Sequence, residues 1–146
     1  MHTAREINDA QPHYVVTGME KRIGSLQGKK IAVLGLSYKP NIDDLRESPA
    51  IEIVHLLEQK QAQVTVFEPY KPNEYQGKAR SAATFEEAVQ DCDIIVLLVA
   101  HDSFKALKPE EVATLTGARI VFDMCGGWQI EDWKAANFQF YKIGHP

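Results

Sequence analysis

The chain has 146 residues, of which 45% are hydrophobic and 25% charged, and its formal net charge is -4 at pH 7. This composition is typical of a globular protein whose length allows one well-formed core and is short for two domains. The negative charge argues against a general nucleic-acid binder, and no apolar run approaches the ~20 residues that cross a bilayer. We therefore expect a cytoplasmic protein without nucleic-acid or membrane partners.

The first 28 residues are expected to be mostly helical. Residues 2–11 have the character of the last turns of a helix, and Pro12 predicts a bend or an exit from it. Apolar residues then recur near helical spacing over 14–26. Because the helix begins without a capping residue, we expect it to continue from a domain further upstream, although an ordinary frayed terminus would look similar.

Apolar strands and amphipathic helices alternate along the rest of the chain. Ser48, followed by Pro49, and Thr84 are the expected N-caps of two helices, and the run 93–99 is apolar enough to be the central strand. The segment 70–80 is polar and rich in turn residues. The order predicts an α/β fold with a three-layer, doubly wound sheet of about five mainly parallel strands, preceded by an N-terminal helix. The expected strands cover 30–36, 63–67, 93–99, 119–122 and 138–143, and the expected helices start after Ser48 and cover 84–90, 109–115 and 130–136.

The loop 38–50 carries most of the charged residues that could act on a ligand. It connects a strand's carboxyl end to a helix's amino end, which is where ligands bind in open α/β sheets. Lys39 is a mobile cation suited to a phosphate, while Asp43 or Asp44 could cap local amides or hold Arg46 in place. A solvated charged loop with a surface ion pair is the competing interpretation, and position alone does not separate the two.

Two nucleotide or phosphate folds are disfavoured by spacing. Glu68, at the end of the second strand, could stand for the acid that binds a ribose, but a dinucleotide turn needs Gly-x-Gly-x-x-Gly followed at once by a helix. Here only Gly35 is present and the helix waits until Pro49. A phosphorylation-receiver domain needs an aspartate at the end of the third strand, where this chain has Ala100 and His101.

Several single residues near strand ends remain candidates. His101 could donate to a substrate or act as a base, although a lone histidine is more often a local hydrogen-bonding residue. Asp123 could orient neighbouring amides, and 126–127 (two glycines) allow a tight turn. Cys92 and Cys125 lie far apart and outside any zinc or Cys-x-x-Cys spacing. No catalytic triad, metal cluster or Walker loop can be assembled.

The stretch 35–50, GLSYKPNIDDLRESPA, resembles the signature that opens the C-terminal UDP-binding domain of the UDP-glucose/GDP-mannose dehydrogenase family. Its KPNIDDLRESP form is most similar to the branch that oxidises UDP-N-acetyl-D-mannosamine. Other segments resemble later family landmarks in the right order, so the resemblance covers nearly the whole chain. These segments are 4–8 with Pro12, 66–69, 99–105 and 121–128.

The resemblance implies the C-terminal, Rossmann-like, UDP-sugar-binding domain of an NAD-dependent UDP-sugar 6-dehydrogenase. Residues 1–28 would be the end of the helix that links it to the central domain, and 29–146 the UDP-sugar-binding domain. Such enzymes use NAD and a catalytic cysteine to convert the sugar's C6 alcohol to a carboxylate for polysaccharide biosynthesis. That cysteine and the NAD site belong to the N-terminal and central domains, so this chain is expected to be inactive alone. Its partners would be the UDP-sugar, those domains and, in the intact enzyme, a second subunit of a homodimer.

The resemblance also assigns roles within the expected site, with no catalytic residue and no metal ligand among them. The residues expected to contact the phosphates or the sugar are Tyr38 and Lys39. Those expected to brace the loop are Asp43, Asp44 and Arg46, and those of a candidate pocket are His101, Asp123 and Cys125. Cys125 stands where the family usually has an arginine or lysine, so a second cation for the substrate is expected to be missing. The alternative is a non-catalytic Rossmann-like module for nucleotide binding, regulation or assembly.

Overall fold

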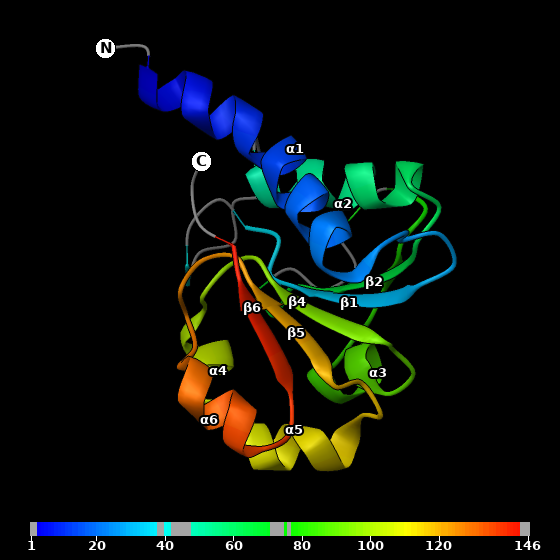
Figure 1. Ribbon diagram of the computed structural model, residues 1–146, viewed down its shortest axis with the longest axis vertical. Coiled ribbons are helices and arrows are strands. Elements are labelled where there is room, and N and C mark those ends of the chain that lie inside the picture. Colours follow the sequence, from blue (N-terminus) through cyan, green and yellow to red (C-terminus); the bar gives the residue numbers. More distant parts are fainter. Residues whose placement is uncertain (1–2, 38–39, 42–47, 71–74, 76, 144–146) are drawn as a thin grey trace.

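The computed structural model describes residues 3–37, 40–41, 48–70, 75 and 77–143, with side chains from Pro12 onward. After the N-terminal helix, helices and strands alternate along the chain except at two places, where two strands and two helices follow one another (Figure 1). The helices are α1 (Thr3–Ile23), α2 (Pro49–Gln59), α3 (Phe85–Val89), α4 (Asp102–Lys105), α5 (Pro109–Leu115) and α6 (Ile130–Ala135). The strands are β1 (Lys30–Leu34), β2 (Gln63–Phe67), β3 (Arg80–Ser81), β4 (Ile94–Leu97), β5 (Ile120–Asp123) and β6 (Gln139–Lys142).

The six strands form one sheet in the order β3-β2-β1-β4-β5-β6, and every neighbouring pair is parallel. In the register, Val33 of β1 lies between Val66 of β2 and Val96 of β4. The chain builds outward from β1 in one direction and then from β4 in the other. The doubly wound parallel fold is therefore confirmed, with β4 next to β1 at the middle of the sheet. The sixth strand is β3, which has two residues and lies at the end of the segment predicted as turns.

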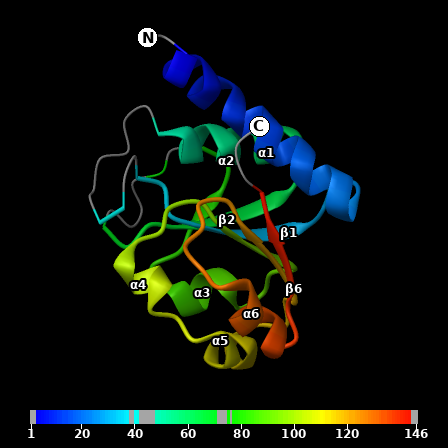
Figure 2. The same ribbon diagram turned by 60° about the vertical axis from the view of Figure 1, so that its left-hand side comes forward.

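Helices cover both faces of the sheet. Figures 1 and 2 show α1 and α2 on one face and α3, α4, α5 and α6 on the other. Alternate residues of β1 enter two separate hydrophobic clusters: Ile31 and Val33 face α1 and α2, whereas Ala32 and Leu34 face the other layer. Because both faces are buried, the central strands read as continuous apolar runs rather than as alternating ones.

Pro12 was predicted to bend or to end the first helix. The prediction of an end is wrong, because α1 runs through Pro12 from Thr3 to Ile23. A proline inside a helix removes one backbone hydrogen bond and costs about 3 kcal/mol. Burial of the helix on the sheet side offsets this cost, since Val15, Val16 and Met19 are almost completely buried in the core beside α2. None of the helices that the structure describes combines the length and the apolar character needed to cross a membrane.

Two predicted helix starts are confirmed by their caps. The Ser48 side chain accepts a hydrogen bond from the Ala50 amide at 3.2 Å, and Pro49 occupies the first turn of α2. At α3 the Thr84 hydroxyl accepts from the Glu87 amide at 3.1 Å. Ser48 also ends the loop that follows β1, so the cap fixes where that loop must finish.

Candidate functional site

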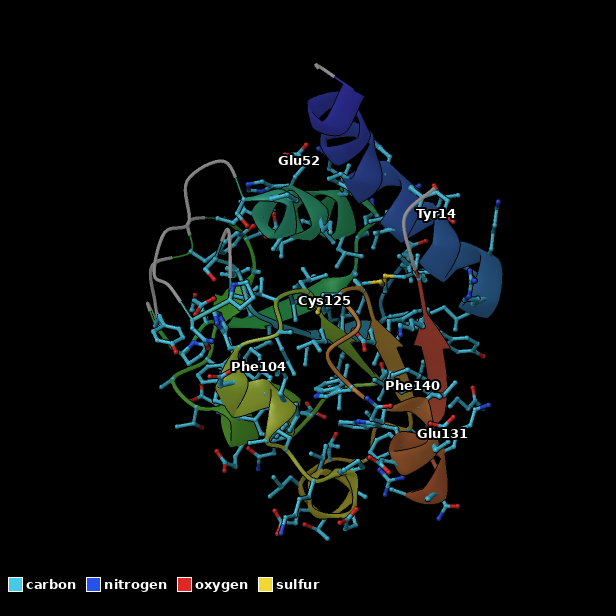
Figure 3. All side chains as sticks on the ribbon, turned by 90° about the vertical axis from the view of Figure 1, so that its left-hand side faces the viewer. Tyr14, Glu52, Phe104, Cys125, Glu131 and Phe140 are labelled. Atoms are coloured by element: carbon cyan, nitrogen blue, oxygen red, sulfur yellow. The ribbon has the colours of Figure 1, made fainter. Side chains whose placement is uncertain are left out.

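The carboxyl ends of β1, β2 and β4 meet at one edge of the sheet, toward which Figure 3 looks. The chain leaves β1 and β4 on opposite sides of the sheet, which makes this edge the topological switch point where ligands of such folds bind. Gly35, just after β1, has φ +94° and lies so close to Val99 that a Cβ atom there would come within 2.7 Å of the Val99 Cβ. The loops after β1 and β4 are thus in direct contact.

The two residues expected to contact the ligand and the three expected to brace the loop lie outside the described residues; they are Tyr38, Lys39, Asp43, Asp44 and Arg46. The structure describes the residues that flank them, and these are anchored. At the far end of the loop, the Ser48 hydroxyl donates to the Ser37 carbonyl at 3.4 Å, so the first and last residues of the loop are in contact. The loop therefore leaves the edge of the sheet and returns to it at one place.

Glu68 is the buried centre of this edge, with a side chain that is 1% exposed. Its Oε1 accepts from the backbone amides of Leu36 at 2.7 Å and Ser37 at 3.0 Å and lies 2.9 Å from Nε2 of His101, while its Oε2 accepts from the Tyr70 amide at 3.0 Å. Burial alone would raise the pKa of Glu68, but hydrogen bonds from the His101 ring and from two backbone amides outweigh it and hold the pKa below its ordinary value. Glu68 is therefore a carboxylate at neutral pH, tied to the start of the loop.

His101 is completely buried and joins Glu68 to the middle of the loop. Its Nδ1 accepts from the Asn41 amide at 2.7 Å. An amide N–H can only donate, so Nδ1 carries no proton and the neutral ring has its hydrogen on Nε2. That Nε2–H points to the Glu68 carboxylate, with the Ser37 hydroxyl 3.3 Å from the same nitrogen. The histidine thus holds two loop segments through its two different nitrogens.

Asn41 completes the connection, and the sequence analysis did not single it out. It adopts a left-handed backbone conformation with φ 63°, and its Oδ1 accepts from the Asp102 amide at 2.9 Å and from the Tyr70 hydroxyl at 3.3 Å. The available signal was Pro40 followed by asparagine, because asparagine tolerates this conformation and bonds to nearby backbone groups. Asn41 therefore ties the loop to the start of α4, two residues after Lys39.

The same contacts explain why this edge does not fit a dinucleotide. A dinucleotide fold offers the free amides of its first turn to the pyrophosphate. Here the amides of Leu36 and Ser37 both donate to Glu68. In the described residues of the turn after β1, these two amides are thus occupied by the Glu68 carboxylate and are not available to a pyrophosphate. This agrees with the absence of a glycine fingerprint after Gly35.

Asp123 organises the turn after β5 in a similar way. It is fully buried, and its carboxylate accepts four backbone amides: Cys125 at 3.0 Å, Gly126 at 2.8 Å and Gly127 at 3.3 Å on Oδ1, and Trp128 at 3.0 Å on Oδ2. The expectation that Asp123 orients neighbouring amides is therefore confirmed in geometry. Its role toward a ligand stays a prediction.

Cys125 lies in this turn, on the side of the molecule that faces the viewer in Figure 3. The residue as a whole is exposed, whereas its Sγ atom is partly buried and lies 3.7 Å from Oδ1 of Asp123. Burial of the thiol and then the charge of Asp123 raise its pKa to about 12. Burial also raises the pKa of Cys92, the other cysteine. Both side chains are thus thiols rather than thiolates at neutral pH, which is unsuitable for a nucleophile.

We expect Cys125 to react slowly despite its exposure. In the Cys92→Ala variant, where Cys125 is the remaining thiol, reaction with a disulfide reagent at pH 8 should be at least about tenfold slower than that of free glutathione. The thiolate fraction falls faster with rising pKa than the intrinsic nucleophilicity grows. The absorbance of the released thiol gives the rate. A rate equal to that of glutathione would contradict the effect of Asp123 on this thiol.

A pocket of about 520 Å³ lies at the opposite, amino-terminal end of the strands. Two pairs of its charged lining residues contact each other, Lys30 with Asp91 at 3.1 Å and Arg80 with Glu87 at 2.8 Å, and the Glu58 carboxylate accepts from the Ala79 amide at 2.6 Å. Since most of the charged groups in this pocket already have partners within the protein, we place the candidate site at the carboxyl edge. Within the described part of the chain, no group of three or more His, Cys, Asp or Glu side chains could hold a metal ion.

Comparison with known proteins finds relatives among sugar-nucleotide dehydrogenases. The chain is 43% identical over 132 residues to the NDP-N-acetyl-D-galactosaminuronic acid dehydrogenase of Ralstonia nicotianae, covering 88% of this chain and 30% of that protein. It is 39% identical over 117 residues to the UDP-N-acetyl-D-mannosamine dehydrogenase of Campylobacter jejuni, covering 77% of this chain and 29% of that protein. The chain thus spans about a third of the length of these relatives.

A solved structure shares the arrangement. The NDP-N-acetyl-D-galactosaminuronic acid dehydrogenase from Methanosarcina mazei Go1 superposes with a TM-score of 0.82 at 26% identity, over 97% of this chain and 30% of that one. Residues 32–129 match the family described as "UDP-glucose/GDP-mannose dehydrogenase family, UDP binding domain". This match runs from β1 through the turn after β5 and so contains the whole carboxyl edge described above. The chain belongs to the UDP-glucose/GDP-mannose dehydrogenase family, as its UDP binding domain.

Proposed function

We propose that this chain binds the nucleotide part of a UDP-sugar through the loop 36–48, within an NAD-dependent UDP-sugar 6-dehydrogenase of which it forms about a third. The observation that carries the proposal is the anchoring of this loop at the switch point by Glu68, His101 and Asn41. A loop that carries Lys39 at that edge is suited to a diphosphate, because lysine is a mobile cation. In this proposal Lys39 and Tyr38 contact the UDP-sugar, and Asp43, Asp44 and Arg46 brace the loop.

The chemistry of oxidation belongs to the rest of the enzyme in this proposal. Neither Cys92 nor Cys125 suits a thiolate nucleophile, because both thiol pKa values are raised. The amides after β1 are used by Glu68, so we expect NAD to bind elsewhere. Residues 1–28 would link the domain 29–146 to that remainder, and α1 already extends beyond the body of the domain in Figure 1. Binding energy from the nucleotide would help to orient the reacting sugar carbon.

The substrate we propose is UDP-N-acetyl-D-mannosamine, oxidised to its uronate by the intact enzyme. The form of the loop sequence and the Campylobacter jejuni relative support this choice. The Ralstonia nicotianae relative, named for N-acetyl-D-galactosaminuronic acid, makes a second N-acetylhexosamine the natural competitor. Both belong to the same chemical class, a nucleoside diphosphate linked to an acetylated amino sugar.

Replacing Lys39 with alanine should weaken UDP binding by about 10- to 100-fold, since a hydrogen bond to a charged phosphate contributes about 1.5–3 kcal/mol. Calorimetric titration of the chain at pH 8 with UDP, UDP-N-acetyl-D-mannosamine and NAD+ measures this. Lys60→Ala serves as the matched control, because Lys60 is an exposed lysine at the end of α2 that pairs with Glu20 at 3.4 Å.

The outcomes separate the candidate functions. UDP binding that Lys39→Ala weakens and Lys60→Ala leaves unchanged supports the proposal. Binding of NAD+ in place of UDP would replace it with a dinucleotide-binding role. Equal losses in both variants would show that only general positive charge matters, and stable self-association without nucleotide binding would favour an assembly module.

A further inference from the structure

We propose that His101 is a positioning residue for the substrate loop and that it holds the loop only as the neutral ring with its hydrogen on Nε2. The resulting "loop latch" consists of Glu68, His101 and Asn41. Its effect on substrate affinity rests on the function proposed above. Its effect on the loop itself does not, and can be measured without any ligand.

The direction of each hydrogen bond fixes which ring nitrogen of His101 carries the hydrogen. Glu68 accepts from the ring at Nε2, and the Asn41 amide donates to the ring at Nδ1. A proton added to the ring must go to Nδ1, the nitrogen with the free electron pair. It would bring two N–H donors face to face across a contact that is now 2.7 Å. One of them has to move, and His101 is the more confined because it is completely buried.

Displacement of Asn41 would also disturb its side-chain contacts. Its Oδ1 also accepts from the Asp102 amide and the Tyr70 hydroxyl, so displacing the residue weakens three contacts together. Lys39 precedes Asn41 by two residues and Asp43 follows it by two. Release of Asn41 therefore removes an anchored point two residues from Lys39, which we propose to contact the diphosphate.

His101 is faced by groups from each neighbouring element. After β2, the Glu68 carboxylate lies at Nε2 and favours a charged ring, and the Tyr70 ring lies 4.9 Å away, centre to centre. From α4, the Phe104 ring lies 5.6 Å away, and the Asp102 side chain is exposed to solvent. Complete burial opposes the charged ring. Among the described residues, Glu68 is the acid that contacts the ring, and it does so at Nε2. Lowering the pH therefore tests the contact between Nδ1 and the Asn41 amide directly.

Two variants separate hydrogen bonding from charge. In His101→Asn the side-chain oxygen can accept from the Asn41 amide in place of Nδ1, but it cannot take up a proton. In Glu68→Gln either orientation of the amide group turns an NH2 toward a backbone donor, because Oε1 and Oε2 both accept from amides. His55→Asn is the matched control: His55 also contacts a glutamate, Glu58 at 3.4 Å, but lies on α2 away from the loop.

The first measurement is nitrogen NMR of the ring together with hydrogen exchange of the Asn41 amide, between about pH 8 and pH 5. We expect the Nε2–H tautomer at pH 8 and protection of Asn41 that falls as the pH is lowered. Protection should be independent of pH in His101→Asn, unchanged from wild type in His55→Asn, and low at every pH in Glu68→Gln. A ring with its hydrogen on Nδ1, or the same pH-dependent loss in His101→Asn as in wild type, would overturn the latch.

The second measurement is titration with UDP-N-acetyl-D-mannosamine, whose phosphates have no terminal group that titrates in this range. Affinity of the wild type should fall by about fivefold from pH 8 to pH 5, the equivalent of one hydrogen bond, and should stay level in His101→Asn. A fall of equal size in both proteins counts against the latch. If no ligand binds at any pH, the proposed function fails for this chain, while the exchange of Asn41 still decides the latch.

Discussion

Replacing Gly35 with alanine is expected to lower the free energy of unfolding by about 2–5 kcal/mol, combining about 1–2 kcal/mol of left-handed backbone strain with about 1–3 kcal/mol of overpacking. At φ +94° the new Cβ would lie 2.7 Å from the Val99 Cβ, 3.0 Å from its nitrogen and 3.1 Å from its oxygen. Two of these three atoms are backbone, so a rotamer change cannot relieve the contact. Urea denaturation followed by circular dichroism measures the loss.

Gly24→Ala is the matched control for this variant. Gly24 has φ +84°, and a Cβ there would meet no atom within 4 Å, so that variant carries the backbone strain alone. The difference between the two losses reports the contact between the loops after β1 and β4. Equal losses would show that these loops separate easily, and that the switch point is less tightly built than the distances indicate.

The order of elements was predictable because strands buried on both faces leave a strong signal. The run 93–99 gave β4, and the stretch 63–67 gave β2 with the bounds that the structure has. The capping residues Ser48 and Thr84 also carry local information, since a side chain that accepts an amide of the next turn acts within a few residues. Such caps can be predicted from the sequence because the residues that form them are near neighbours in it.

The two features that were predicted wrongly or missed, Pro12 and β3, depend on distant residues instead. The two residues of β3 pair with Thr65 and Val66, and nothing local distinguishes them within a turn-rich segment. Pro12 ends many helices, but here packing against α2 outweighs the local cost. Both outcomes depend on contacts with residues far away in the sequence, which a single sequence does not display.

The candidate site shows the same division. The sequence placed charged groups at the carboxyl edge, and it named His101 and Asp123 as residues near strand ends. It could not pair Glu68 with His101, because 33 positions separate them. Glu68 was considered only as a ribose-binding acid. In the structure the Glu68 carboxylate accepts hydrogen bonds from the backbone amides after β1. A dinucleotide fold would use an acid at this position to bind the ribose, whereas here it holds the start of the loop.

Glu68 and Asp123 have the same structural role at two strand ends. Each is a buried carboxylate that accepts several backbone amides and so fixes the turn that follows a strand. Such amides would otherwise be unpaired donors at the ligand edge. These amides are already used by the two carboxylates, which supports our proposal that the side chains of the loop 36–48, rather than the amides of the turns, bind the substrate.

Asp123→Asn should lower the free energy of unfolding by about 2–4 kcal/mol, although the two side chains have nearly the same shape. Oδ1 accepts three amides and Oδ2 accepts that of Trp128, so the NH2 group of asparagine faces a backbone donor in either orientation. Thermal and urea denaturation measure the loss. Asp102→Asn is the matched control, because its exposed carboxylate lies 3.9 Å from Lys105 and should change stability by less than about 0.5 kcal/mol.

The same variant has a second, independent consequence at Cys125. The charge of Asp123 is one of the causes that raise the pKa of this thiol, after burial. Its removal should therefore speed the reaction of Cys125 with a disulfide reagent at pH 8, measured in the Cys92→Ala background under conditions where the protein stays folded. Lower stability with unchanged thiol reactivity would mean that burial alone controls Cys125. Faster reaction with unchanged stability would mean that the four amides find other acceptors, and the turn after β5 would then owe its shape to Trp128 packing rather than to the carboxylate.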